Sequence, residues 1–194
     1  LYTLAASQFG LGRPEQAARL FDQVRAIYAE QLGPRQPETL KAAGNLAASY
    51  QAAGRLSEAE GILTGLLQAW TESHSPDHPE ALRALNHLGL TYKYRGRFEK
   101  AIALFEDGVR RSEKAFGADD PRSLMCRSNL AAAYVSARQP ERAVLLQQRL
   151  GACGPARAVF TLTQPHDVEV EHRRQVDVHR RVVGHRQRAA TAVA

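Results

Sequence analysis

Cysteine and aromatic residues are scarce in this sequence. Its 194 residues include 2 cysteines, Cys126 and Cys153, 1 tryptophan and 7% aromatic residues in all. Two cysteines provide neither a disulfide framework nor a zinc-ligand spacing, so we expect a reducing compartment and a cytoplasmic location. Alanine is abundant while aromatic residues are few, which favours helix over sheet.

Long apolar runs are missing too. The longest are only a few residues, such as 143–146, whereas a membrane-spanning helix needs about 20. The first residues show no charged segment followed by an apolar core, so neither a membrane span nor a signal peptide is expected. Because the chain begins at Leu1 rather than at a methionine, we interpret it as a fragment of a longer protein.

Signatures of catalysis and of cofactor binding are also absent. Neither the phosphate-binding pattern GxxxxGK[ST] nor the zinc motif HExxH occurs, and Gly10 and Gly12 lack the third glycine of a dinucleotide fingerprint. We therefore expect no catalytic residue, no cofactor and no metal, and the chain is not predicted to be an enzyme. Because we interpret the chain as a fragment, the expectation leaves room for a catalytic or nucleotide-binding domain upstream of Leu1.

What the sequence does contain is a repeat of 42 residues. Several independent columns keep this spacing, and a repeat should be sought before any other feature. The columns are Gly12, Gly54, Gly96 and Arg138; Leu4, Leu46, Leu88 and Leu130; Tyr50, Tyr92 and Tyr134; Ala17, Ala59, Ala101 and Ala143; Pro37, Pro79 and Pro121; and Leu40, Leu82 and Leu124.

Each repeat has the pattern of two helices. Apolar residues recur at helical spacing on both sides of the glycine column, and a glycine that can adopt positive φ ends the first helix. Gly33 and Gly117 are predicted to end second helices, and Asp120 followed by Pro121 is predicted to start the next first helix. The expected fold class is therefore all-α.

The motifs within the repeat resemble the tetratricopeptide repeat (TPR). That family has the pattern L-G-x2-Y followed by A-x3-F. Leu88-Gly89-x2-Tyr92 with Ala101-x3-Phe105 matches it in every letter, and Ala17-x3-Phe21 supports the first unit. The fourth unit has Gln147 where an aromatic residue is expected. The resemblance implies a right-handed α-solenoid of antiparallel helix pairs over residues 1–150.

The period of 42 exceeds the common 34 and is similar to that of kinesin-light-chain repeats. The expected units are about 1–37, 38–79, 80–121 and 122–150. Repeats of this long form also occur in bacterial and fungal multidomain regulators. The resemblance therefore implies a scaffold or sensor module of a larger regulatory protein, with a protein or peptide as its ligand.

In this family the first helix of each unit lines a concave groove. The positions on either side of the leucine column face into that groove, and Asn side chains there can hold a peptide backbone through both donors and acceptors. The set is net positive, so we expect it to favour an acidic segment. The groove candidates are Lys41, Asn45, Gln51, Arg83, Asn86, His87, Lys93, Tyr94 and Asn129.

Two other clusters invite a chemical interpretation. Residues 73–78, with the letters SHSPDH, combine serine, histidine and aspartate, but the same columns in other units are ordinary inter-repeat loops, so a loop is predicted. Cys126 lies in the column of Ala42 and Ala84, which predicts a small packed residue rather than a nucleophile.

The repeat pattern ends near Leu150, and residues 151–194 form a basic tail. This segment holds 7 Lys/Arg and 4 Asp/Glu, with four of the seven histidines: His166, His172, His179 and His185. We interpret it as disordered, while a short strand pair and a frame error in the source sequence remain open. A nucleic-acid-associated regulator that uses this tail is the alternative function, although acidic residues interrupt the tail and no aromatics are interleaved.

Overall fold

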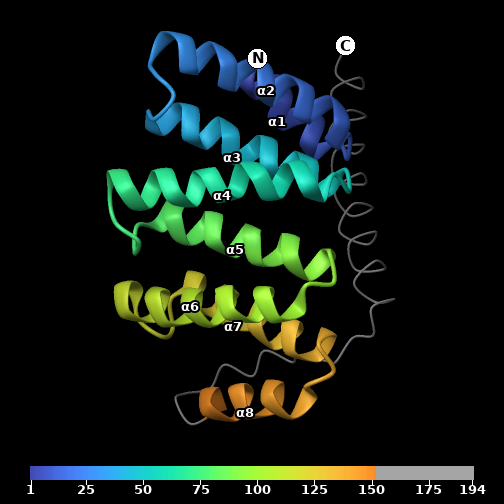
Figure 1. Ribbon diagram of the computed structural model, residues 1–194, viewed down its shortest axis with the longest axis vertical. Coiled ribbons are helices and arrows are strands. Elements are labelled where there is room, and N and C mark those ends of the chain that lie inside the picture. Colours follow the sequence, from blue (N-terminus) through green and yellow to red (C-terminus); the bar gives the residue numbers. More distant parts are fainter. Residues whose placement is uncertain (152–194) are drawn as a thin grey trace, which may run out of the picture. The chain divides into compact units, whose positions relative to one another are not determined.

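The computed structural model describes residues 1–151, with side chains up to residue 146, and all regular structure in this part is α-helical (Figure 1). The all-α prediction is therefore confirmed. The tail beyond Gly151 lies outside the described residues. The helices are α1 (Tyr2–Gly10), α2 (Pro14–Gln31), α3 (Pro37–Ala52), α4 (Leu56–Ser73), α5 (Pro79–Tyr94), α6 (Phe98–Phe116), α7 (Pro121–Ser136) and α8 (Pro140–Gly151).

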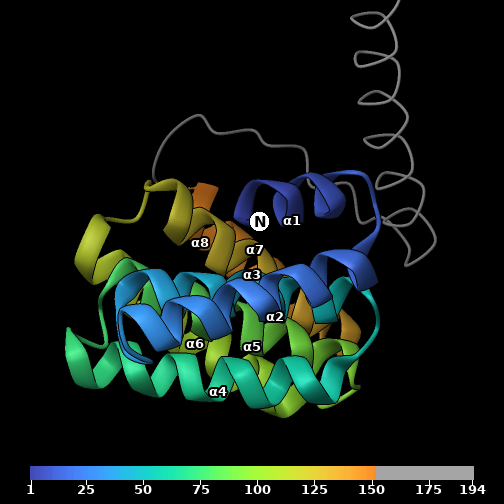
Figure 2. The ribbon, with the colours of Figure 1, turned by 90° about the horizontal axis from the view of Figure 1, so that it is seen from above.

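The helices form pairs that stack in chain order (Figures 1 and 2). Each helix packs against the next one along the chain, and α3, α5 and α7 also contact one another in succession. The first helices of the second, third and fourth pairs, α3, α5 and α7, begin at Pro37, Pro79 and Pro121. This arrangement is the expected α-solenoid. No helix within the described residues is long and apolar enough to cross a membrane.

The turn inside each pair is set by one residue with positive φ. Gly12, Gly54 and Gly96 have φ of 70°, 75° and 71°, and Arg138 takes the same place in the last pair with φ of 59°. The residue that follows donates its backbone N–H to a carbonyl five positions back, as when Arg97 donates to Tyr92 at 2.9 Å. This bond ends the first helix, as in the Schellman motif. Glycine adopts this conformation at little cost, whereas arginine does not.

A proline opens the first helix of the second, third and fourth pairs. At these positions a backbone N–H would have no partner within the helix, so proline fits there. The residue before it caps the helix in two cases: Asp120 accepts from the N–H of Arg122 at 2.9 Å, and His78 accepts from that of Glu80 at 3.2 Å. The predicted cap at Asp120 is confirmed.

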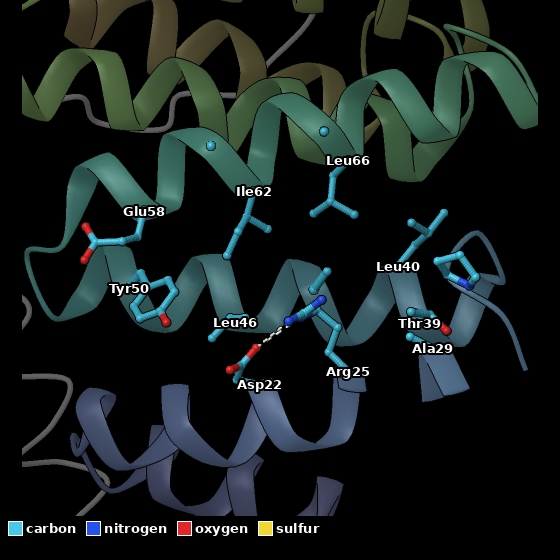
Figure 3. A pocket seen from close by; sticks show the side chains of 14 residues that line it. Asp22, Arg25, Ala29, Thr39, Leu40, Leu46, Tyr50, Glu58, Ile62 and Leu66 are labelled. Atoms are coloured by element: carbon cyan, nitrogen blue, oxygen red, sulfur yellow. Dashed lines mark hydrogen bonds and ion pairs between the residues drawn. The ribbon is translucent and has the colours of Figure 1, made fainter. Parts of the chain in front are cut away.

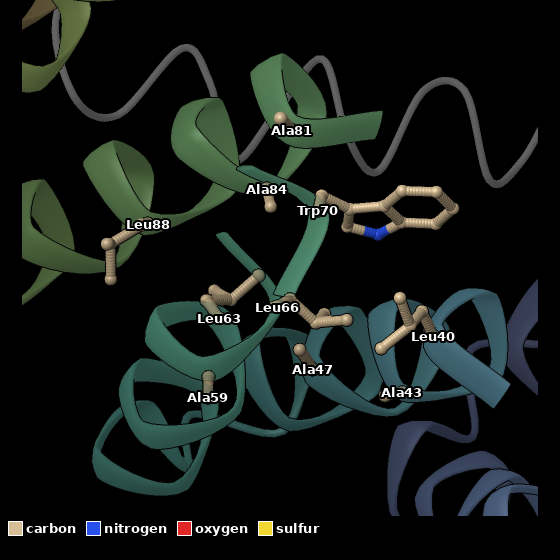
Figure 4. Packing of buried hydrophobic residues seen from close by; sticks show 10 residues of the cluster. All are labelled: Leu40, Ala43, Ala47, Ala59, Leu63, Leu66, Trp70, Ala81, Ala84 and Leu88. Atoms are coloured by element: carbon tan, nitrogen blue, oxygen red, sulfur yellow. The ribbon is translucent and has the colours of Figure 1, made fainter. Parts of the chain in front are cut away.

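The hydrophobic core is shared between pairs. One cluster joins three successive helices across a unit boundary (Figure 4). Because three helices supply each cluster, no pair completes its core alone. The members of this cluster are Leu40, Ala43 and Ala47 from α3, Ala59, Leu63, Leu66 and Trp70 from α4, and Ala81, Ala84 and Leu88 from α5.

The repeat motif is a matched pair of small and large residues. The ring of Phe105 lies fully buried against Gly89, where an added Cβ would be 2.6 Å from the Cε1 atom of Phe105. Glycine at position 89 therefore allows α5 and α6 to approach while the phenylalanine fills the space between them.

Two residues of the leucine columns are not in the core. Leu4 is 49% exposed and Leu124 is 42% exposed, although their counterparts Leu46, Leu88, Leu40 and Leu82 are buried. A buried leucine of the first column needs the second helix of the preceding pair: Leu46 packs in a cluster with Phe21 of α2. Column membership alone therefore overestimates the core.

Candidate functional site

The surface formed by α1, α3, α5 and α7, here the first-helix face, carries a ladder of polar side chains. The Nδ2 atom of Asn45 donates to the hydroxyl of Tyr2 at 2.7 Å, and that of Asn129 donates to Oδ1 of Asn86 at 2.8 Å. Both bonds join residues 43 apart in the sequence. The same step of the repeat thus produces the same type of bond between neighbouring first helices.

The step of this ladder between α3 and α5 differs, because Gly44 on α3 has no side chain that could accept a hydrogen bond. His87, the counterpart of Asn45 and Asn129, instead pairs its Nδ1 with Oε1 of Gln51 at 2.9 Å. The Nε2 of Gln51 donates to the carbonyl of His87 at 2.8 Å and to the Thr91 hydroxyl at 2.7 Å. Since the amide oxygen of Gln51 can only accept, Nδ1 of His87 carries the proton.

The surroundings of His87 disfavour the charged form of its imidazole. Burial lowers the pKa of its imidazole below the usual 6.5, and the positive charge of Arg83 lowers it further. Arg83 itself is held by Glu80, whose Oε2 accepts from Nε at 2.7 Å. Its guanidinium lies beside Gly44, where an added Cβ would be 3.4 Å from Nη2. Arg83 therefore occupies the space that the missing side chain at Gly44 leaves.

Three of the predicted groove residues remain available to a ligand. Lys41 is exposed on α3, and Tyr94 is 59% exposed at the end of α5. Lys93 is partly buried, and its Nζ lies 5.4 Å from the centre of the Tyr94 ring. Burial lowers the pKa of Lys93. Within residues 1–146 no carboxylate forms an ion pair with Lys41 or Lys93.

The other predicted groove residues are engaged with the protein itself. Asn86 is only 3% exposed, so it supports its neighbours rather than facing a ligand. Asn45, Gln51, His87 and Asn129 are partly buried and bonded across helices. Sequence columns indicate that these residues share a face, but hydrogen bonds between helices depend on which side chain stands opposite, and a column does not contain that information.

Ser73 is the last residue of α4, and residues 74–78 form the loop between α4 and α5. The ring of His78 stacks on Trp70, with 5.0 Å between ring centres and 7° between planes, and His74 lies 4.6 Å from His78. Ser73 bonds to His74 at 2.8 Å. His78 caps α5, and the rings of both histidines lie against Trp70. In the part of the chain that is described, no three His, Cys, Asp or Glu residues gather as metal ligands.

Cys126 is buried on α7, in agreement with its prediction as a packed residue. Burial raises the pKa of its thiol, and a hydrogen bond with Ser112 partly offsets that rise. A buried thiol with a raised pKa is a poor nucleophile. Cys153 and the four tail histidines lie outside the described residues, as do the side chain of Gln147 and the basic residues of the nucleic-acid hypothesis.

One buried charged side chain was not anticipated from the sequence. Arg127 takes the position of Ala43 and Leu85 in the other units, and it is buried. Its Nη1 lies 3.2 Å from Oε1 of Glu113, and its Nη2 donates to the carbonyl of Ala118. The guanidinium thereby ties α7 to the end of α6 and the loop after it. A charged residue in an apolar column was the signal that could have indicated this role.

The chain was compared with protein families and with known structures. The family model "Tetratricopeptide repeat" matches residues 1–64, 42–114 and 94–150. None of the curated proteins matches the chain.

Solved structures share the fold. Two crystal structures of nearly identical TPR-like repeats assigned to a kinesin light chain of Podosopora anserina, one of them with a single glutamine replaced by methionine, align with TM-scores of 0.72. Their sequence identities are 26% and 27%, and both alignments cover 93% of this chain and 86% of the other. BtubC (BKLC) of P. vanneervenii aligns with a TM-score of 0.66 at 20% identity, covering 84% of this chain and 68% of the other. That last likeness concerns the fold alone.

Proposed function

The chain belongs to the tetratricopeptide repeat family, and we propose that its first-helix face binds an acidic segment of a partner protein. TPR arrays generally mediate protein–protein interaction. Both the surface used and the charge of the ligand are part of this proposal. We further propose that the module serves as a scaffold or sensor in a larger cytoplasmic regulatory protein, without catalytic chemistry of its own.

The observation that carries the proposal is the presence of cations without carboxylate partners on this face. Elsewhere in the described residues, most arginines form ion pairs with nearby acids, as Arg95 and Arg97 do with Glu60. Lys41 and Lys93 do not, and Lys93 is also partly desolvated. A partly buried lysine gains from an incoming carboxylate because the lower local dielectric strengthens their attraction.

The remaining features of the face suit a peptide. The ladder of Asn45, His87 and Asn129 fixes the spacing of the first helices, so the face is preorganised before a ligand arrives. The exposed ring of Tyr94 beside Lys93 offers an apolar surface next to the charge. Aromatic and cationic side chains of this kind are enriched where interfaces gain most of their binding energy.

An array of immobilised synthetic peptides with graded net charge tests the proposal. We expect binding to rise with negative charge and to fall at least about tenfold in the double variant Lys41→Glu plus Lys93→Glu. The double variant Lys100→Glu plus Lys114→Glu on α6 changes the net charge equally, and it should bind as the parent chain does. Equal binding by both double variants would contradict the proposal.

A further inference from the structure

Two hollows flank α3, and they differ in size and in lining. The larger, of about 590 Å³, opens between α2 and α4, where Ile62 and Leu66 point toward the apolar side chains of α3 (Figure 3). The smaller lies beside Gly44, and Arg83 and His87 of α5 are among its lining residues. At about 10 Å³ it has room for about one water molecule. A ligand that covers this place therefore meets it through hydrogen bonds rather than by inserting a side chain.

The imidazole of His87 uses one ring nitrogen within the protein. Its Nδ1 donates to Oε1 of Gln51 at 2.9 Å. The Gln51 amide is fixed in this orientation because its Nε2 points at two acceptors, the His87 carbonyl and the Thr91 hydroxyl. That hydroxyl gives its own proton to the same carbonyl at 2.9 Å, so it can only accept from Gln51. With the proton on Nδ1, Nε2 of His87 carries a lone pair and is a hydrogen-bond acceptor.

The second ring nitrogen of His87 is open to a ligand. Within residues 1–146 no group bonds to Nε2, and the polar side-chain atoms of this range that are buried without a partner are Ser123 Oγ and Arg127 Nε. Nε2 is not one of these two atoms, so it reaches the surface. It thus presents an acceptor on the same face as Lys41 and Lys93, whose ammonium groups can only donate.

An acceptor in this position discriminates between ligands. Burial, and then the charge of Arg83, lower the pKa of His87, so the lone pair on Nε2 is retained at neutral pH. A ligand that covers the partly buried ring without offering a donor leaves this acceptor unpaired, which costs binding free energy. A ligand that places a donor there avoids that cost.

His87 also lies within reach of a segment bound at the end of α5. Tyr94 follows His87 by seven residues, which is two helical turns, so both lie on the same side of the helix. The rise between them is about 10 Å, the length of about three residues of extended peptide. A segment at Lys93 and Tyr94 can therefore extend over His87. The donor that every such segment has is its main-chain N–H.

We propose that Nε2 of His87 accepts a hydrogen bond from a main-chain N–H of the acidic segment. This inference rests on the proposed function and deepens it. Lys41 and Lys93 attract the charge of the segment, whereas His87 fixes the position of its main chain along α5. His87 is therefore a residue that determines specificity, and its effect depends on one N–H of the ligand rather than on the ligand charge.

The probe is an acetylated and amidated synthetic peptide with a central pair of glutamates among alanines. At neutral pH only its main-chain amides can donate hydrogen bonds. In matched peptides one peptide bond at a time is replaced by an ester, which removes a single N–H. Affinities for the full chain and for His87→Phe are measured by calorimetry. We expect one ester position to weaken binding to the parent chain about tenfold and to leave binding to His87→Phe unchanged.

The ring nitrogens of His87 in the ¹⁵N-labelled parent chain provide a second measurement that needs no variant. In the free chain, Nε2 should give the NMR signal of an unprotonated ring nitrogen. That signal should move toward the protonated range when the unmodified peptide binds, and it should move less with the ester peptide that binds weakly. A change of fold in His87→Phe therefore does not prevent the test.

The outcomes separate this inference from the proposed function. No binding of the unmodified peptide would overturn both. Binding that every ester peptide retains in full, an ester effect that persists in His87→Phe, or a protonated Nε2 in the free chain would overturn the role of His87 alone. The loss of binding expected in Lys41→Glu plus Lys93→Glu tests only the proposed function.

Discussion

Arg95 crosses the unit boundary and places its Nη1 2.8 Å from Oε2 of Glu60 on α4. Arg97 approaches the same carboxylate at 3.1 Å, and Arg95 also donates to the Ser57 hydroxyl at 3.0 Å. The turn around Gly96 therefore links two pairs as well as two helices. The arginines beside this glycine are therefore part of the packing between units.

Glu60→Gln should destabilise the fold by about 1 kcal/mol, because it removes one partner from two partly exposed charged contacts. Urea unfolding measures the change. Glu30→Gln serves as the control, since Glu30 is exposed near the end of α2 and forms no ion pair within residues 1–146. A loss for Glu30→Gln as large as that for Glu60→Gln would show that the contact to the turn has no stabilising role.

Arg138→Gly should stabilise the fourth pair. Arg138 is the one non-glycine residue with positive φ in the described part of the chain, and the left-handed conformation costs about 1 kcal/mol more for it than for glycine. The midpoint of urea unfolding should rise accordingly. Ala103→Gly, in the middle of α6, should lower the midpoint by a similar amount. A change of the midpoint in the same direction in both variants would refute this explanation.

The same substitution should have opposite effects at two helical glycines. Gly89→Ala places a Cβ 2.6 Å from the buried ring of Phe105 and should cost about 1–3 kcal/mol. Gly65→Ala meets no atom and should gain about 1 kcal/mol from helix propensity. Thermal unfolding of both variants checks the signs. A loss at Gly65 would mean that a neighbouring atom lies close to this position in solution.

Stability should fall in mildly acidic solution through His78. Burial lowers the pKa of His78 below its usual 6.5, the charge of His74 lowers it further, and Glu80 partly opposes them. Unfolded chains therefore bind the proton more readily, so stability is full above about pH 6.5 and decreases as pH falls through the folded-state value. Protonation also removes the acceptor that Nδ1 offers to the N–H of Glu80.

His78→Asp provides the test because Asp120 caps α7 in the corresponding position. Unfolding free energies of both proteins are compared at neutral pH and at about pH 5. On acidification the variant should lose less stability than the parent. Part of the pH dependence of stability should remain in the variant, because the pKa of His87 is also lowered. An unchanged difference between the two pH values would mean that His78 does not contribute to the pH dependence.

The sequence was sufficient to predict the backbone because repeated residues imposed repeated local geometry. Gly54 and Gly96 recur where φ must be positive, and Pro79 and Pro121 recur where helices begin. These constraints act within a few residues along the chain, so a single sequence expresses them.

The candidate site was harder to predict because its contacts join residues about 40 positions apart. Whether His87 faces a ligand or bonds to Gln51 depends on Gly44, a residue in another helix. The stacking of His78 on Trp70 likewise needs the loop conformation. Columns of a repeat predict the face on which a side chain lies, but they do not predict its partner there.

The central claim is that an acidic segment binds the first-helix face, and mapping that peptide on the ¹⁵N-labelled chain tests it most directly. With the tightest acidic peptide from the array, we expect shifts centred on Lys41, Lys93 and Tyr94 that disappear in Lys41→Glu plus Lys93→Glu. Shifts centred on α2 and α4, or shifts that persist in the charge-reversed chain, would contradict it.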